Sequence, residues 1–213
     1  MYKVTRITVD PDDPNQDSGM WIGGEMAYVS DWPLNPEGQP LLHLFSINCN
    51  TLSQQVHIPS LPQDKYISVF STYSASEYFL DQVTYTGDEL EWNENILAGC
   101  TYVSVSSHPL TSVCPVPPIP LSGVRLIEME LDDQAFPAFP AFSFFSPTLP
   151  NGVKGIDHLL EEHQLVCQIY SGDFPEPYRD ILGLPDANGY LFLRSGPASV
   201  HAPFDGIFFV QTA

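Results

Sequence analysis

The stretch IPSLPQDKYISVF, from Ile58 to Phe70, returns in altered form as ILGLPDANGYLFL, from Ile181 to Leu193. Both copies carry an apolar residue, a Leu-Pro pair and a polar turn, and a tyrosine then opens an apolar strand. The spacing extends the match, because Tyr66–Asp81 and Tyr190–Asp205 both span 15 positions. We interpret the copies as one strand hairpin that occurs once in each half of the chain, the two packing on a shared core.

The flanks of the two copies are also similar. Leu80–Val83 matches Phe204–Ile207, and we therefore expect each copy to end in a second strand. With 21 Pro and 14 Gly, the chain is interrupted every few residues, as in proteins built from short strands and turns. Apolar or alternating runs predict strands at 41–47, 66–73, 101–106, 124–131, 166–170, 190–194 and 207–211.

Two elements can be predicted in more detail. Within 124–131, Ile127 and its alternate neighbours should face the core, whereas Glu128 and Glu130 should face water. The best helix candidate is short and covers 156–163, where apolar and acidic residues separate onto two faces. The sequence therefore predicts an α+β fold, predominantly antiparallel β, with two pseudo-symmetric halves and few short helices.

The whole chain, 1–213, is expected to form a single domain. Its halves should cover about 20–108 and 150–213, joined by the proline- and phenylalanine-rich segment 109–149. Within that segment AFPAFPAFSFF, from Ala135 to Phe145, places Phe136 and later phenylalanines three residues apart, as in an extended polyproline-like chain. These rings either fill the core between the halves or form an exposed aromatic patch, which would mark a binding site.

Charge is the outlying property of this sequence, with 26 acidic against 7 basic residues and a formal net charge of −19. Between Lys65 and Arg125 there is no Lys or Arg at all. Such a field repels nucleic acid and anionic lipid and speeds encounter with a basic partner. The alternative is that the acids serve solubility alone.

Two groups of acids are the candidate partner contacts. The first lies in the base-free stretch, and the second follows along the strand at 124–131. The predicted partner-binding residues are Asp88, Glu89, Glu91, Glu94, Glu128, Glu130, Asp132 and Asp133.

Motifs for catalysis, metal or cofactor binding are absent from the sequence. It contains no GxGxxG, GxxxxGK[ST], HExxH or GxSxG pattern. His158 and His163, five positions apart, would diverge by roughly 140° on a helix and could not share a metal ion. The four scattered cysteines are expected to be small buried hydrophobes. We therefore predict no catalytic residues, no metal and no cofactor, although a spatial site need not leave a local motif.

No run approaches the roughly 18 apolar residues that span a membrane. The first residues, MYKVTRITVDPDDP, reach aspartate and proline before an apolar signal region could form. We therefore expect no membrane association and a cytoplasmic location, while the oligomeric state stays open.

The stretch GGEMAYVSDWPLNPEGQPLLHLFSINCNTL, from Gly23 to Leu52, resembles the opening of the YwqG family, a bacterial domain of unknown function. The shared features are a Gly-Gly turn, Trp32-Pro33, a Gly-x-Pro that leads into an apolar strand, and Ile-Asn at the end of that strand. Leu184–Phe192 and the closing Phe204-Asp205 are similar as well. The chain departs from the family pattern at Met26, where proline is usual, at Ser46 and across 114–149.

The resemblance implies a binding role rather than a known activity, because no activity is shared across that family. Relatives found beside polymorphic-toxin genes imply an immunity protein that neutralises a cognate toxin domain by direct binding, and the net charge of −19 predicts that this domain is basic. The alternatives are a housekeeping protein-interaction module and an enzyme whose site leaves no motif.

Overall fold

The structure is a computed structural model that describes residues 2–109, 111–131, 139–195 and 204–212. Most of the described chain forms short strands. The main sheet contains β1 (Tyr2–Asp10), β2 (Met20–Ile22), β4 (Leu42–Asn48), β5 (Tyr66–Ser71), β6 (Thr101–Ser106), β8 (Ser122–Leu131), β9 (Phe144–Phe145), β10 (His163–Tyr170), β11 (Asn188–Arg194) and β12 (Gly206–Gln211). Two further strands, β3 (Met26–Ala27) and β7 (Ser112–Val113), pair with each other.

Helical segments are few and short. They are α1 (Cys49–Ser53), α2 (Leu80–Val83), α3 (Glu89–Glu91), the π-helical turn η1 (Trp92–Leu97) and the 3-10 turns η2 (Leu159–Glu161) and η3 (Ser171–Asp173). Within the described ranges no helix has the length and apolar character that crossing a membrane requires. The predicted fold class, predominantly antiparallel β with few short helices, is confirmed.

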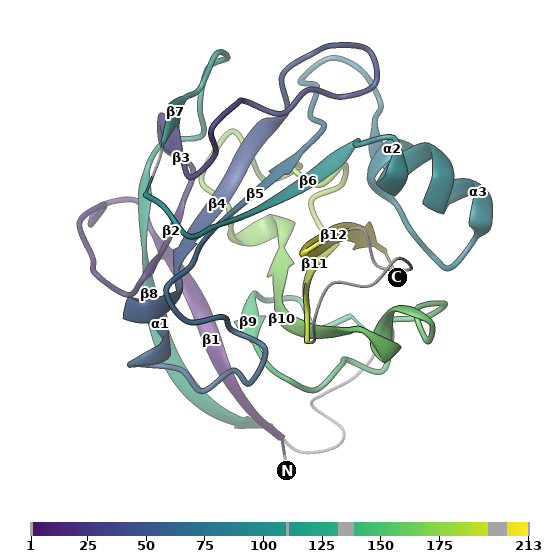
Figure 1. Cartoon of the computed structure of the whole chain (residues 1–213). Coiled ribbons are helices and arrows are strands. Elements are labelled where there is room, and N and C mark those ends of the chain that lie inside the picture. Colours follow the sequence, from purple (N-terminus) through teal and green to yellow (C-terminus); the bar gives the residue numbers. More distant parts are fainter. Residues whose placement is uncertain (1, 110, 132–138, 196–203, 213) are drawn as a thin grey trace.

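The main sheet curls into a nearly closed barrel with the strand order β12-β11-β10-β9-β1-β8-β2-β4-β5-β6 (Figure 1). Its two edge strands, β6 and β12, lie against each other. Across this seam the Thr101 hydroxyl donates to the carbonyl oxygen of Phe208 at 2.6 Å. Buried apolar side chains from both halves, among them Ile7, Phe45 and Leu191, fill the interior as one cluster.

The strand order is symmetric about the central pair β1 and β8. These strands run antiparallel in continuous register from Tyr2 opposite Leu131 to Asp10 opposite Gly123. β2, β4, β5 and β6 follow on the β8 side, and β9, β10, β11 and β12 follow in the same relation on the β1 side. Four strands therefore follow on each side of the central pair, and β8 and β9, within the segment expected to join the halves, belong to the sheet.

A β-bulge occurs at the same place in both halves. In β4 one extra residue separates His43 from Phe45 opposite β5, and in β10 one extra residue separates Leu165 from Cys167 opposite β11. A bulge inserts one unpaired residue and bends its strand, which helps a sheet to curve into a barrel. The shared position of the bulge gives a direct correspondence between the residues of the two halves.

This correspondence moves the sequence alignment by two residues. β5 and β11 do take equivalent places, as the repeat predicted. Counted from the bulge, however, Tyr190 opposite Gln168 corresponds to Ser68 opposite Ser46, not to Tyr66. Side chains alternate along a strand with a period of two, so a shift of two residues keeps each side chain on its face. The apolar pattern therefore survives the shift.

The second strand of the first copy was predicted at the wrong place. Leu80–Val83 forms α2, whereas its match in the second half begins β12. The Thr84 amide and hydroxyl both donate to the carbonyl oxygen of Leu80, at 3.1 and 2.9 Å, and close a helical turn. The strand that follows β5 in the sequence and pairs with it is β6, which begins at Thr101.

The predicted helix at 156–163 is wrong. Only the 3-10 turn η2 forms, and His163 already opens β10, where it lies opposite Arg194. The backbone of Ser195 donates to the carbonyl oxygen of Glu162 at 2.9 Å. Pairing with β11 therefore ends the helical turn earlier than the amphipathic pattern suggested.

The prediction for β8 is correct for Glu128 and Glu130, which are exposed, and wrong for Ile127. Val124 and Leu126 pack in the barrel interior, and Ile127 is 45% exposed on the outer face. By alternation, Glu128 and Glu130 lie on the inward-facing side, beyond the end of the apolar core. The alternating pattern fixed which residues share a face but not which face is inside.

The phenylalanine segment contributes to the core where the structure describes it. Phe144 and Phe145 are buried on opposite faces of β9. Phe142 is half-buried beneath Arg6, whose guanidinium carbon lies 5.5 Å from the ring centroid. Phe136 lies outside the described residues. The described part agrees with the interpretation that these rings fill the core.

Candidate functional site

The Gly-Gly turn after β2 brings two distant segments together. Gly23 and Gly24 both have positive φ, 62° and 91°. A Cβ on Gly23 would lie 2.5 Å from the carbonyl oxygen of Ile119, and the Gly24 amide donates to that oxygen at 2.9 Å. Glycine is therefore required here, because the proline-rich segment packs directly against the turn.

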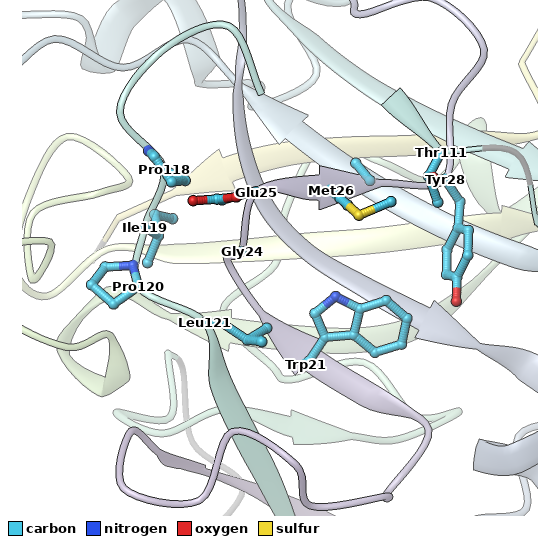
Figure 2. Close-up of a pocket in the computed structure, with 11 residues that line it drawn as sticks. Trp21, Gly24, Glu25, Met26, Tyr28, Thr111, Pro118, Ile119, Pro120 and Leu121 are labelled. Atoms are coloured by element: carbon cyan, nitrogen blue, oxygen red, sulfur yellow. The ribbon is translucent and has the colours of Figure 1, made fainter. Parts of the chain in front are cut away.

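A groove of about 590 Å³ opens between this turn, β3 and the proline-rich segment (Figure 2). Its lining residues are Trp21, Gly24, Glu25, Met26, Ala27, Tyr28, Thr111, Pro118, Ile119, Pro120 and Leu121. Met26 and Leu121 are 50% and 45% exposed, which is unusual for large apolar side chains. We call this surface the Glu25 groove, because Glu25 is the one charged residue among its described lining residues.

Aromatic side chains form one wall of the Glu25 groove. The rings of Trp21 and Tyr28 meet edge to face with centroids 5.4 Å apart, and Tyr28 and Tyr66 follow at 4.4 Å. Burial, with a smaller contribution from Tyr66, raises the pKa of Tyr28, so its phenol stays neutral. Within the described residues the Glu25 carboxylate has neither a hydrogen-bond nor an ion-pair partner. The groove therefore offers one free negative charge among neutral, largely apolar walls.

Three serines hold the segment that carries Tyr28. Ser46, Ser68 and Ser104 lie side by side across β4, β5 and β6, and we call them the serine row. The Tyr28 amide donates to Ser68 Oγ at 2.8 Å, and Ser104 Oγ donates to the Tyr28 carbonyl oxygen at 2.8 Å. Small hydroxyl side chains thus let a backbone segment approach the barrel and fix one wall of the groove.

A buried histidine continues this network. His43 Nε2 lies 2.8 Å from Ser46 Oγ, which lies 2.6 Å from Ser68 Oγ. Burial lowers the pKa of His43 to about 4, so the imidazole is neutral at physiological pH. His43 is 1% exposed and both serines are fully buried, which keeps substrates away. The arrangement resembles a histidine–serine pair but has a structural role.

The first group of predicted contact acids divides into two kinds. Asp88 caps α3 by accepting from the Leu90 amide at 2.7 Å, and Glu91 accepts from the amide and hydroxyl of Thr86. Glu89 and Glu94 are exposed, and their carboxylates have no partner within the described part of the chain. Only these two are free to meet another molecule without giving up an internal bond.

The second group lies elsewhere on the barrel. Glu128 and Glu130 are exposed near the end of β8, on the other side of the barrel from α3 (Figure 1). Asp132 and Asp133 lie outside the described residues. The structure therefore does not bring the predicted acids together into one surface, and their contact with a partner stays a prediction.

Other titratable groups show no metal-binding arrangement. Among the described residues, no three His, Cys, Asp or Glu side chains are grouped as a metal ion requires. His158 Nε2 is occupied by the Tyr85 hydroxyl at 2.8 Å. Cys49, Cys100 and Cys167 are buried free thiols, as predicted, and burial raises their pKa values, whereas Cys114 is only half-buried.

Sequence reasoning missed the Glu25 groove. Its signals were present, because the Gly-Gly turn and the PVPPIP run both stand out, but they are about 95 residues apart. Comparison with known proteins adds no further guidance: no family model matches the chain, and no curated protein matches it. The resemblance to the YwqG family therefore stays a prediction that rests on the residues quoted above.

Proposed function

We propose that this protein is a non-catalytic acidic binding protein that acts in the cytoplasm as an immunity protein, neutralising a basic toxin by direct binding. The observation that carries the proposal is the Glu25 groove, an exposed apolar surface with one unpaired carboxylate on a chain of net charge −19. Exposed apolar surface of this kind is typical of interaction sites. The strong negative field favours a basic partner.

A lysine or arginine side chain of the partner fits the chemistry of the groove. Its methylene groups can pack against Leu121 and Met26, and its cationic end can reach Glu25. Trp21 offers a ring face or edge in the same groove, and arginine stacks well on such rings. Aromatic and arginine side chains commonly dominate the energy of an interface.

The unpaired acids of α3 and η1 support a separate, long-range electrostatic contribution to the rate of association. Glu89 and Glu94 add unneutralised charge to a stretch of the sequence without Lys or Arg. Such charges raise the rate of association more than they stabilise the complex, and salt screens them over about 8 Å at physiological ionic strength. We therefore assign steering to these acids and anchoring to Glu25.

The first experiment is co-expression of the protein with the product of the neighbouring gene, followed by pull-down and measurement of association and dissociation rates. Glu25→Gln should raise the dissociation rate about tenfold or more, because it leaves a partner cation unpaired. Glu89→Gln with Glu94→Gln should lower the association rate several-fold at low salt and leave dissociation nearly unchanged.

The matched control is the double variant Glu77→Gln and Glu161→Gln, which removes the same charge from two other exposed positions. It should change the association rate less than the Glu89 and Glu94 variant. An association rate that is independent of salt, together with a dissociation rate that is unchanged by Glu25→Gln, would refute this account of recognition.

A further inference from the structure

The inward-facing row of the β1–β8 pair changes from apolar to charged along its length. In the core, Ile7 lies opposite Leu126. Further along, Thr5 lies opposite Glu128, and Lys3 lies opposite Glu130. An inward row normally stays apolar because burying a charge is costly. Its polar end therefore marks a place where the barrel opens.

A pocket of about 490 Å³ occupies this open end of the barrel. Val56, Ile58 and Phe145 are buried and supply apolar surface. Lys3, Thr5, His57, Glu128, Glu130 and Ser146 supply the polar groups. We call it the mouth pocket, and its size lies in the range of small-molecule sites.

The Thr5 hydroxyl is an independent sign of a ligand. Thr5 is 9% exposed, and its hydroxyl has no hydrogen-bond partner within the described residues. It lines the mouth pocket, directly across from Glu128. The hydroxyl oxygen is not among the fully buried side-chain atoms without a partner, so it is accessible from the pocket and available to a group that enters it.

The charges of the mouth pocket are unequal. Lys3 stands opposite Glu130, so the residue across from Glu128 is a neutral threonine. Two carboxylates against one ammonium leave one negative charge in excess among the carboxylate and lysine side chains of the pocket. A ligand anion would meet repulsion here, and a ligand cation would be stabilised by Glu128.

We propose that the mouth pocket binds a small organic ammonium ion with an apolar body. Its three N–H donors match the carboxylate oxygens of Glu128 and the hydroxyl oxygen of Thr5. Its apolar body packs against Phe145, Val56 and Ile58. This site is separate from the Glu25 groove and does not depend on the proposed immunity function.

Phenethylamine is the probe, with phenethyl alcohol and phenylpropionate as neutral and anionic compounds of similar size. Titration is followed by two-dimensional amide NMR of the whole protein. Phenethylamine should give saturable shifts at residues of β1, β8 and 56–58. The alcohol should bind about tenfold more weakly, because it lacks the charge-assisted bonds. Phenylpropionate should bind more weakly still.

Variants test the two groups that define the site. Glu128→Gln should weaken phenethylamine about tenfold, and Thr5→Val several-fold, with the shape of each side chain nearly kept. Glu77→Gln is the charge control and should leave the affinity unchanged. Melting temperatures within a few degrees of wild type would show that the variants fold.

The proposal is wrong if wild-type protein gives no saturable shift, or if the alcohol binds as tightly as the amine. Equal weakening by Glu77→Gln would show only a general effect of net charge and would also overturn it. Failure of these tests would not affect the toxin-binding experiment, because that experiment measures the effects of changing Glu25, Glu89 and Glu94.

Discussion

The two halves of the barrel share the same strand arrangement but carry different side chains on their outer faces. In the first half, Ser46, Ser68 and Ser104 form the serine row. At the corresponding positions of the second half lie Gln168, Tyr190 and Phe209, all buried, and we call the last two the aromatic row. The serine row holds a backbone segment by hydrogen bonds, as Gln168 also does by donating to the carbonyl oxygens of Pro140 and Phe142, whereas the aromatic row packs with other rings.

The difference shows how the same strand arrangement can border the Glu25 groove in one half and a closed layer of rings in the other. Phe209 stacks on Phe192 with centroids 5.6 Å apart and meets Tyr85 at 5.5 Å, so that layer is closed. The serine row occupies little volume, and the space is taken by the chain that carries Tyr28 and borders the Glu25 groove. Small side chains on the barrel therefore create the room that the segment carrying Tyr28 needs.

The largest effect is expected from truncating the aromatic row. Phe209→Ala should lower the free energy of unfolding by about 4 kcal/mol, because it removes a fully buried ring and leaves a cavity. Ser104→Ala, at the corresponding position of the serine row, should cost only about 1 kcal/mol through the lost bond to Tyr28. Urea denaturation of both variants measures the contrast, and equal losses would contradict it.

A second effect concerns pH and the histidine beside the serine row. The pKa of His43 is about 4 in the folded protein and near 6.5 when unfolded, so only the unfolded chain binds the proton between these values. Stability is therefore complete above pH 6.5 and falls as the pH drops toward 4, by about 3 kcal/mol at most.

His43→Leu places in the first half the residue that the second half has at Leu165. In this variant the free energy of unfolding should fall less between pH 7 and pH 4, because the contribution of His43 is removed. The measurement is the difference between the variant and wild-type denaturation curves over that pH range. His163, whose pKa burial also lowers, is present in both proteins and cancels in that difference. Parallel curves would show that His43 does not carry the pH dependence.

The smallest expected effect tests whether the serine row supports the wall of the Glu25 groove. Ser68→Ala leaves the Tyr28 amide without its acceptor and should cost about 2 kcal/mol. Because Trp21 meets the Tyr28 ring edge to face, the tryptophan emission should change as well. Ser195→Ala, whose hydroxyl bonds the Glu162 carbonyl oxygen at an exposed site, is the control and should change neither property measurably. Unchanged emission in Ser68→Ala would separate the serine row from the groove.

The sequence predicted the strands well because their signal is local. Runs such as 66–73 and 101–106 contain their own alternation and are bounded by turn residues. Orientation was harder: β8 has apolar residues on both faces, and only its neighbours decide which face is inside. The predicted helix at 156–163 failed for the same reason, since pairing with β11 overrides a short amphipathic pattern.

The candidate sites were less accessible to sequence reasoning than the fold. Glu128 was named as a surface acid, yet it lines a pocket whose other residues come from β1 and from 56–58. Glu25 was not named, because an isolated glutamate among 26 acids carries no local signal. A pocket forms between segments that meet only after folding, so no single residue in the sequence indicates it.

Because β1 lies at the centre of the sheet, it cannot pair with its neighbouring strands until much of the chain has been synthesised. Its partner strand β8 ends at Leu131, which follows Asp10 by 121 positions, and its other neighbour β9 comes later still. At roughly 5–20 residues per second, a ribosome needs about 6–24 s to supply β8. During that interval Val4 and Ile7 lack the residues of β8 that lie opposite them in the folded protein. The nascent chain is therefore most in need of a chaperone at its beginning, and faster translation would shorten the period of risk.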